Sequence, residues 1–232
     1  MSLVPREHPG WEKYESVVQN NVEWLDTTLY KILGWMPRCH PRVLDGGRIV
    51  FPIYSDRWRL SIMAITDDGG ETWHSSRPIV GPGTIQPSLC QREDGTILAF
   101  MRVDNDIPIP RVHVSESSDR GESWTRPEAT DIPNPDSAVD CLVLDSGNWI
   151  MLCNDTETER FQLAVKLSMD EGETWPVTRY LEKSEDPRYR YHYPSVIQTD
   201  DGIIHTAYSW HTPGGNSIKY AAFNEAWILE GE

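Results

Sequence analysis

Polar side chains that could do chemistry recur at two kinds of place in this sequence. One group lies in short lead-in segments just before an apolar segment: His40, Gln86, Asn134, His192 and Tyr193. The other group lies in loops between two apolar segments: Asp56, Arg59, Arg102, Asp104, Asn154, Glu157, Glu159, Arg160 and His211. Arginine binds carboxylates through two parallel hydrogen bonds, and carboxylates and histidines transfer protons. The mixture is typical of a pocket for a polar ligand such as a carbohydrate, although each residue alone also fits a solvated loop.

The elements that must position these residues follow a repeat. The pattern [ST]-x-D-x-G-x-[ST]-W occurs at residues 66–73, 117–124 and 168–175, so Trp73, Trp124 and Trp175 are 51 residues apart. A degenerate copy without the Asp and Gly ends at Trp227. The Asp side chain accepts hydrogen bonds from its own loop and the Gly permits a positive φ, so the motif predicts a structural turn.

Each repeat is predicted to form four strands. A lead-in segment precedes the first strand, an Asp-Gly turn follows it, a polar loop separates the second and third strands, and the Asp motif separates the third and fourth. Antiparallel repeats of this length are typical of β-propeller blades. We therefore predict an all-β protein with about four blades, over residues 35–80, 81–130, 131–180 and 181–232. A β-sandwich is the alternative.

The segment before the first blade has a different pattern. Apolar residues between Trp11 and Leu33 recur at spacings of three and four, which predicts one amphipathic helix, and Gly34 would end it. We therefore assign residues 1–34 to a leader and a helix.

The strand order sorts the loops between two faces of the propeller. Antiparallel strands reverse direction at each turn, so the Asp-Gly turns and the Asp motifs share one face, called here the motif face. The lead-in segments and the loops between second and third strands share the other, called the site face. Function is expected on the site face, because rigid scaffolds carry their functional residues on variable loops.

Composition limits the partners and cofactors. The 232 residues carry a net charge of −15, which disfavours nucleic acid and anionic membranes as partners. An anionic substrate would therefore need a local cluster of arginines. No apolar run has the length of a membrane span and we expect no signal peptide, which leaves the localisation open. The four cysteines, Cys39, Cys90, Cys141 and Cys153, lack metal-site spacing, so we expect free thiols, no metal site and no cofactor.

The three motifs resemble the Asp boxes, or BNR repeats, of the sialidase (neuraminidase) superfamily. The resemblance extends from Trp35 to Trp227, and segments 83–88, 134–137 and 192–198 are similar to exo-sialidase-like proteins. It implies a six-bladed propeller, of which this chain would supply about four blades, with the deficit at the N-terminus. Open blade edges would favour a homo-oligomer.

The resemblance also implies a glycoside hydrolase that acts on terminal sialic acid or another acidic sugar. Sialidases bind the substrate carboxylate with three arginines. The best candidates here are Arg102 and Arg160, with Arg59 or Arg190 as the third. The other polar residues would bind the sugar: His40, Gln86, Asn134, Asn154, His192 and His211.

Sialidases use a tyrosine, activated by a glutamate, as nucleophile, and an aspartate as acid–base catalyst. Tyr193 is the candidate nucleophile here, with Glu157 or Glu159 as its partner. Asp56 or Asp104 is the candidate acid. The Arg-Ile-Pro signature that opens sialidase catalytic domains is absent, and a core aromatic at a strand start is the alternative for Tyr193.

Other functions stay open on the sequence alone. The chain could be a non-catalytic propeller that binds glycans or proteins, or an inactive fragment of a larger sialidase-like protein. A lyase acting on a uronate-containing polysaccharide is a further alternative, because His192 or His211 could abstract a proton near neutral pH.

Overall fold

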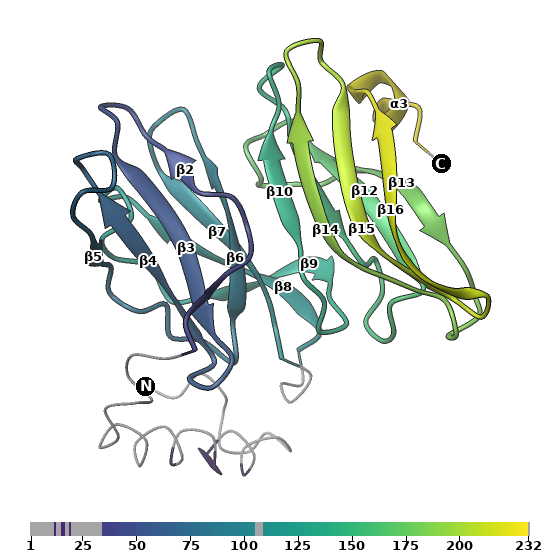
Figure 1. Ribbon diagram of the computed structural model, residues 1–232, viewed down its shortest axis with the longest axis horizontal. Helices are drawn as coiled ribbons and strands as arrows, with labels where there is room; N and C mark the ends of the chain where they lie inside the picture. Colours follow the sequence, from purple (N-terminus) through teal and green to yellow (C-terminus); the bar gives the residue numbers. More distant parts are fainter. Residues whose placement is uncertain (1–11, 13–14, 17–18, 20–33, 105–108, 232) are drawn as a thin grey trace.

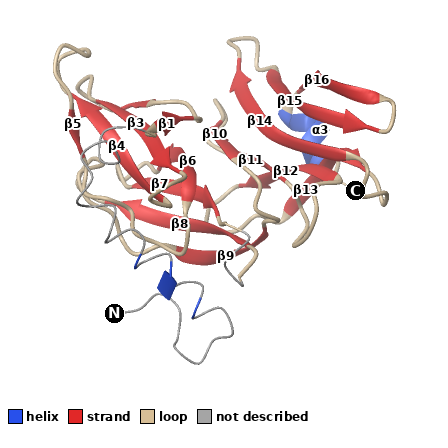
Figure 2. Cartoon of the chain, turned by 60° about the horizontal axis from the view of Figure 1, so that its bottom comes forward, coloured by secondary structure: helices blue, strands red, loops and turns tan. Residues whose placement is uncertain are grey.

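The chain folds into four antiparallel sheets that follow one another in sequence order. The computed structural model describes residues 12, 15–16, 19, 34–104 and 109–231. Figure 2 shows the sheets along an arc, with the first sheet at one end and the last at the other. Each sheet is one blade of a β-propeller, as the 51-residue period predicted. The helix predicted before Gly34 lies almost entirely outside the described residues.

The strands of each blade are visible in Figure 1. Blade 1 contains β1 (Met36–Pro37), β2 (Arg42–Val43), β3 (Ile49–Ser55), β4 (Leu60–Thr66) and β5 (His74–Ser75). Blade 2 contains β6 (Ile85–Gln91), β7 (Ile97–Arg102), β8 (Arg111–Ser117) and β9 (Glu128–Pro133). Blade 3 contains β10 (Asp140–Val143), β11 (Trp149–Cys153), β12 (Gln162–Ser168) and β13 (Val177–Lys183). Blade 4 contains β14 (Arg190–Gln198), β15 (Ile204–Thr212) and β16 (Gly215–Phe223), followed by the helix α3 (Glu225–Leu229).

Blade 4 ends differently because its copy of the Asp motif is degenerate. The segment after β16 forms α3 in place of a turn. The side-chain oxygen of Asn224 accepts a hydrogen bond of 2.9 Å from the Trp227 N–H, so Asn224 caps the helix. In the described part of the chain β16 is therefore an edge strand, and the expected self-association concerns this edge.

The hydrophobic core lies between the blades. In β7, Leu98 and Phe100 pack toward blade 3, whereas Ile97, Ala99 and Met101 pack toward blade 1. In β11 of blade 3, Trp149, Met151 and Cys153 likewise pack toward blade 2, whereas Ile150 and Leu152 pack toward blade 4. Strands covered on both faces read as continuous apolar runs, which is the pattern of β7 and β11. In β3 and β14, by contrast, buried positions alternate with more exposed ones, so blades 1 and 4 each have one open face among the described residues.

The Asp motif forms a turn that is closed by its own side chains. In the third copy, the Thr174 N–H and hydroxyl donate to the Asp170 carboxylate at 2.8 and 2.5 Å, and the Gly172 N–H donates to the Ser168 hydroxyl at 2.9 Å. The hydrogen bonds from Thr174 hold the pKa of Asp170 below its usual range. The same contacts recur in the first two copies. The motif is thus a structural turn, in agreement with the sequence.

Each Asp turn also packs against the preceding blade. A Cβ on Gly121 of blade 2 would lie 3.1 Å from the Val50 side chain of blade 1. The Trp175 ring of blade 3 lies 5.7 Å from the Phe100 ring of blade 2, edge to face. Trp73 belongs to blade 1, which follows no blade in the described structure, and it is 48% exposed. The tryptophans of the second and third motifs are therefore partly buried, in contact with the core between their own blade and the blade before it.

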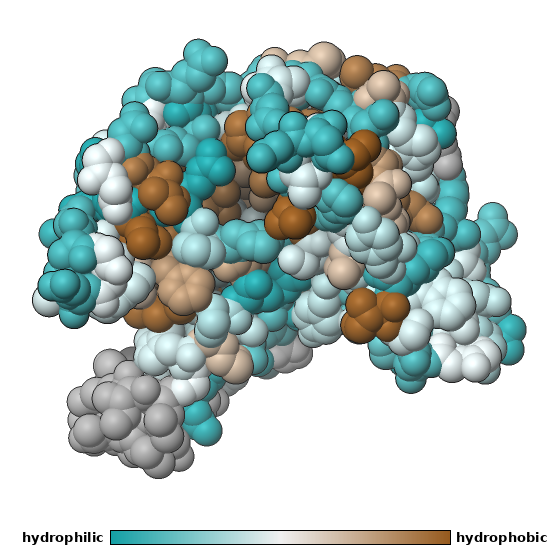
Figure 3. Space-filling view, turned by 45° about the horizontal axis from the view of Figure 1, so that its top comes forward, coloured by the Kyte–Doolittle hydropathy of each residue, from teal (hydrophilic) through white to brown (hydrophobic). Residues whose placement is uncertain are grey.

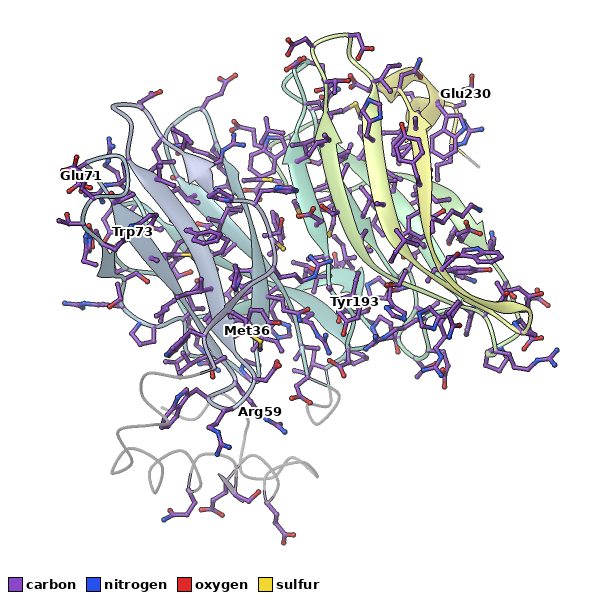
Figure 4. The ribbon with its side chains drawn as sticks, in the orientation of Figure 1. Met36, Arg59, Glu71, Trp73, Tyr193 and Glu230 are labelled. Carbon is purple, nitrogen blue, oxygen red and sulfur yellow. The ribbon has the colours of Figure 1, made fainter. Side chains whose placement is uncertain are left out.

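The two faces separate as the strand order predicted. In Figure 4, Glu71 and Trp73 of the first Asp motif lie higher in the view than Tyr193, which is near the middle, and Arg59 lies below all three. On the motif face, the Arg120 side chain donates to the Asp45 carbonyl at 2.8 Å, so an Asp motif contacts an Asp-Gly turn of the neighbouring blade. Figure 3, seen from this side, shows a mainly hydrophilic surface with separate apolar patches.

The four cysteines are buried free thiols, and burial raises the pKa of Cys39 and of Cys153 to about 12. Among the described residues, no helix is both long enough and apolar enough to span a membrane.

Two glycines with the same backbone conformation test the packing between blades. Gly172 has φ +87° and a Cβ there would lie 2.9 Å from the Trp149 ring and 3.2 Å from the Phe100 ring, whereas Gly147 has φ +88° and open space around it. We expect Gly147→Ala to lower the free energy of unfolding by about 1–2 kcal/mol, the cost of a left-handed residue. Gly172→Ala should cost roughly 1–3 kcal/mol more, because it also overpacks the core.

Urea unfolding of both variants measures this difference. Equal losses of stability would show that the Asp turn of blade 3 packs tightly neither on the Trp149 ring of its own blade nor on the Phe100 ring of blade 2.

Candidate active site

The lead-in segments of blades 2, 3 and 4 each hold one residue in the left-handed region of backbone space. Gln86 has φ +58°, Asp136 φ +57° and Tyr193 φ +56°. Gln86 and Tyr193 lie where the strand pairing shifts register, between Ile85 and Ser88 and between His192 and Ser195. Bulges of this kind redirect side chains, and such backbone conformations cluster at functional sites. The same strained geometry in three blades marks the inner part of the site face as the candidate site.

Tyr193 lies between two guanidinium groups. The Cζ atoms of Arg38 and Arg160 each lie 5.8 Å from the centre of the Tyr193 ring. The His192 ring packs against it edge to face, with 4.8 Å between ring centres. The Tyr193 side chain is 42% exposed, so a ligand from solvent can reach it. The structure thus brings together the predicted nucleophile and one of the predicted carboxylate-binding arginines.

Asp136 contacts Arg102 and Arg160, the two arginines that the sequence analysis ranked first for binding the substrate carboxylate. Its carboxylate forms an ion pair with the Arg102 guanidinium, and its main-chain oxygen accepts a hydrogen bond from Arg160. Arg102 also donates to the Gln86 side-chain oxygen at 3.3 Å. Burial raises the pKa of Asp136, and the charge of Arg102 opposes that rise. Asp136 was not among the sequence-based candidates, although its lead-in segment contributed to the resemblance.

Arg38 is the second residue that sequence reasoning missed. It donates to the Pro194 carbonyl of blade 4 at 2.7 Å and to the Val139 carbonyl of blade 3 at 3.1 Å. Arg38 therefore connects the first blade to the last across the inner side of the arc. Its position two residues before His40, in the lead-in segment of β2, is the signal that could have identified it.

Two of the predicted polar residues hold the backbone of the site. The Asn134 amide donates to the Ser137 carbonyl at 2.6 Å and its oxygen accepts from the Ser137 N–H at 3.1 Å, which closes a tight turn around Asp136. Asn154 donates to the Tyr191 carbonyl at 2.7 Å, beside the Arg160 loop. Both polar atoms of the Asn134 amide and the NH₂ group of Asn154 bind main-chain atoms, whereas the buried Asn154 oxygen has no hydrogen-bond partner among the described residues. The contacts of Asn134 and Asn154 therefore hold the backbone around the site.

The two predicted histidines of blade 4 lie together, with 4.8 Å between the ring centres of His192 and His211. Burial lowers the pKa of His192 to about 4, and the charges of Arg160, His211 and other basic neighbours add to the shift. His192 is therefore neutral at pH 7 and leaves the charge of the cluster to its arginines.

His40 lies farther along the inner strands and contacts two groups through the same nitrogen. Its Nε2 is 3.3 Å from the Ser195 hydroxyl and 3.6 Å from the Asp140 carboxylate. A Ser-His-Asp relay needs the acid and the serine on opposite ring nitrogens. These residues therefore do not form a nucleophilic triad.

The remaining predicted residues have other neighbours. Arg59 pairs with Asp104 at 3.2 Å, and Glu157 pairs with Arg111 at 2.5 Å. Asp56, Glu159 and Arg190 are exposed. Within the described residues, the contacts of Tyr193 include neither Glu157 nor Glu159, so the proposed glutamate partner stays a prediction.

The site as a whole concentrates positive charge. Arg38 and Arg160 lie beside Tyr193, and Arg102 and Arg160 contact Asp136, in a chain whose net charge is −15. Guanidinium groups match carboxylates in shape as well as in charge. No group of three or more His, Cys, Asp or Glu side chains suited to a metal ion occurs in the part of the chain that the structure describes.

Comparisons with known proteins show the family of this chain. A family model described as BNR repeat-like domain matches residues 19–206. A sialidase from Micromonospora viridifaciens is 25% identical over 179 residues, which cover 72% of this chain and 26% of that protein. The chain thus spans about a quarter of the sialidase it matches.

Solved structures show the same fold at low identity. A Dyadobacter fermentans protein of unknown function has a TM-score of 0.68 at 18% identity, covering 81% of this chain and 53% of its own. The Hadza microbial sialidase Hz136 has a TM-score of 0.68 at 19% identity, covering 84% and 39%. The NanB sialidase of Streptococcus pneumoniae has a TM-score of 0.66 at 19% identity, covering 81% and 30%.

The titration of His192 tests the placement of Arg160. By NMR, the His192 ring should titrate near pH 4, below the usual 6.5. Because the folded protein binds this proton less well than the unfolded chain, the stability linked to His192 is lost as pH falls from about 6.5 toward 4. Arg160→Ala should raise the pKa of His192 by removing a nearby positive charge.

The matched control is Arg188→Ala, which removes an exposed arginine that pairs with Asp186. It should leave the pKa of His192 unchanged. An unchanged pKa in Arg160→Ala as well would place Arg160 away from His192.

Proposed function

Because this chain belongs to the family of BNR repeat-like domains, within the sialidase superfamily, we propose that it is a glycoside hydrolase acting on a terminal acidic sugar. Sialic acid is the first candidate. The proposal goes beyond the family and the fold, which the relatives share, to the activity itself.

One observation carries the proposal: Arg38 and Arg160 lie beside an accessible tyrosine, and Asp136 connects Arg160 to a third arginine, Arg102. Arginines on blades 1, 2 and 3 would bind the carboxylate of the sugar. Tyr193 on blade 4, after losing its proton to a base, would attack the anomeric carbon while the bond to the aglycone oxygen breaks and an acid, Asp56 or Asp104, protonates that oxygen. Water would then hydrolyse the tyrosyl–sugar bond and release the sugar. A neutral tyrosine suits this role, because a carboxylate nucleophile would be repelled by the carboxylate of the substrate. In this proposal Arg38 is the third arginine, in place of Arg59 or Arg190.

A non-catalytic glycan-binding propeller is the second candidate. The observation in its favour is that the described contacts of Tyr193 are with Arg38, Arg160 and His192, and include no carboxylate. A nucleophilic tyrosine needs a base to accept its proton. Glu157, Glu159, Asp56 and Asp104 keep their proposed catalytic roles only if turnover is observed.

Turnover of a fluorogenic sialoside tests the proposal. Tyr193→Phe should lower kcat by about 10²–10⁴-fold, the usual range for a side chain that takes part in the chemistry. Arg160→Ala should lower kcat/KM by roughly 10–100-fold, the loss expected for one charge-assisted hydrogen bond. Tyr220→Phe and Arg188→Ala, on exposed side chains, should leave the rate unchanged.

Two results would reject the hydrolase. The first is no turnover of the sialoside or of a panel of acidic and neutral glycosides. The second is saturable binding of the sugar without turnover and with no effect of Tyr193→Phe, which would establish the binding propeller.

A further inference from the structure

The Arg102 guanidinium already has an anion beside it. The Arg102 side chain is only 10% exposed and the Asp136 side chain 16% exposed, and the two form an ion pair. A buried charge without a partner is costly, so Asp136 stabilises Arg102 in the molecule without ligand. The carboxylate of Asp136 thus occupies one of the arginines that the proposed function assigns to the substrate.

The backbone fixes Asp136 in this place independently of its own carboxylate. Asn134 closes the turn at Ser137, and Arg160 binds the main-chain oxygen of Asp136. The residue has φ +57°, a conformation that aspartate and asparagine tolerate better than most side chains. Removing the negative charge at this position should therefore leave the turn in place.

The ion pair leaves part of the guanidinium unused. Asp136 contacts Arg102 through Oδ1 and Nη2, and Gln86 takes Nη1. The buried Nε of Arg102 has no hydrogen-bond partner within the described structure. A carboxylate that binds Nε and Nη2 together would make two parallel hydrogen bonds, which is the stronger geometry. Arg102 is therefore better suited to a bidentate anion than to the one it holds.

We propose that Asp136 is a specificity-determining residue that acts as an internal anion, which an incoming carboxylate must displace from Arg102. The inference rests on the proposed function, because it takes the acidic sugar as the incoming group. A neutral sugar that displaced Asp136 would leave Arg102 without a counter-charge. Asp136 thus lowers the affinity for every ligand and lowers it least for ligands that carry a carboxylate.

Binding of free N-acetylneuraminic acid tests this proposal without any need for turnover. NMR titration of the protein at pH 7 would compare the wild type with Asp136→Asn. We expect the variant to bind the acid roughly tenfold more tightly, which is the effect of about 1.4 kcal/mol in competition. Its melting temperature without ligand should fall, because Arg102 loses its counter-charge.

Tighter binding together with a lower melting temperature would show that Asp136 competes with the ligand for Arg102 and does not merely order the Arg102 side chain. If Asp136 only orders Arg102, Asp136→Asn should weaken binding as well as stability, and that result would overturn the proposal. Asp136→Gly is the second variant, since glycine also accepts the positive φ and removes the carboxylate completely. It should tighten binding in the same direction.

Two controls complete the experiment. Asp67→Asn breaks the Arg48–Asp67 pair on the motif face and should leave the affinity unchanged. The methyl ester of N-acetylneuraminic acid lacks the negative charge and should bind weakly to all variants. Absence of binding of the acid to every folded variant would refute the proposed function, whereas binding that Asp136→Asn does not tighten would refute only the role of Asp136.

Discussion

The contact of each Asp turn with the blade before it is the constraint on which the rest of the structure depends. The turn closes on its own carboxylate, and its glycine and tryptophan pack against the middle strands of the preceding blade. Gly172 has no room for a side chain, because the Trp149 ring of its own blade and the Phe100 ring of blade 2 both lie close to it, so the turn holds the two blades together at this point. An Asp turn packed between two blades on the motif face also fixes the distance between the loops at the other ends of the same strands. The distances between loops on the site face therefore depend on turns that are not part of the site.

The candidate site takes one part from every blade. Arg38 comes from blade 1, Arg102 from blade 2, Arg160 from blade 3 and Tyr193 from blade 4. These residues meet because repeated blades bring their lead-in segments and their second-to-third-strand loops to the same inner end. The cluster concentrates positive charge in a strongly acidic chain, and each guanidinium is held by main-chain oxygens or by a single carboxylate. Local geometry thus outweighs the overall charge, since screening limits the reach of distant surface charges to about 10 Å at moderate salt.

Much of the fold could be predicted from the sequence, because a fixed repeat period with the same turn residues in each copy indicates a repeat fold. The 51-residue period predicted the blades, and the order of turns predicted the two faces. The motif that lost its Asp and Gly became α3, which follows from the same chemistry. The partners of the arginines could not be predicted in this way. Arg38 is bound by Val139 and Pro194, which lie more than a hundred residues away, and no local pattern contains such a pairing. Asp136 was missed because one carboxylate in a polar segment differs from its neighbours only through the arginine that it meets.

The geometry separates recognition of an anion from catalysis. The contacts that hold Arg38, Arg102 and Arg160 lie within the described residues, so the arginine cluster that is proposed to bind an anion is assembled there. The catalytic part is less complete, because the described neighbours of Tyr193 are positively charged or neutral groups, and a nucleophilic tyrosine must pass its proton to a base. The arginines near the ring cannot accept the proton of the phenol. Under the proposed function, affinity for an acidic sugar and turnover of its glycoside would therefore be distinct properties, and the first would depend on the arginines of blades 1 to 3.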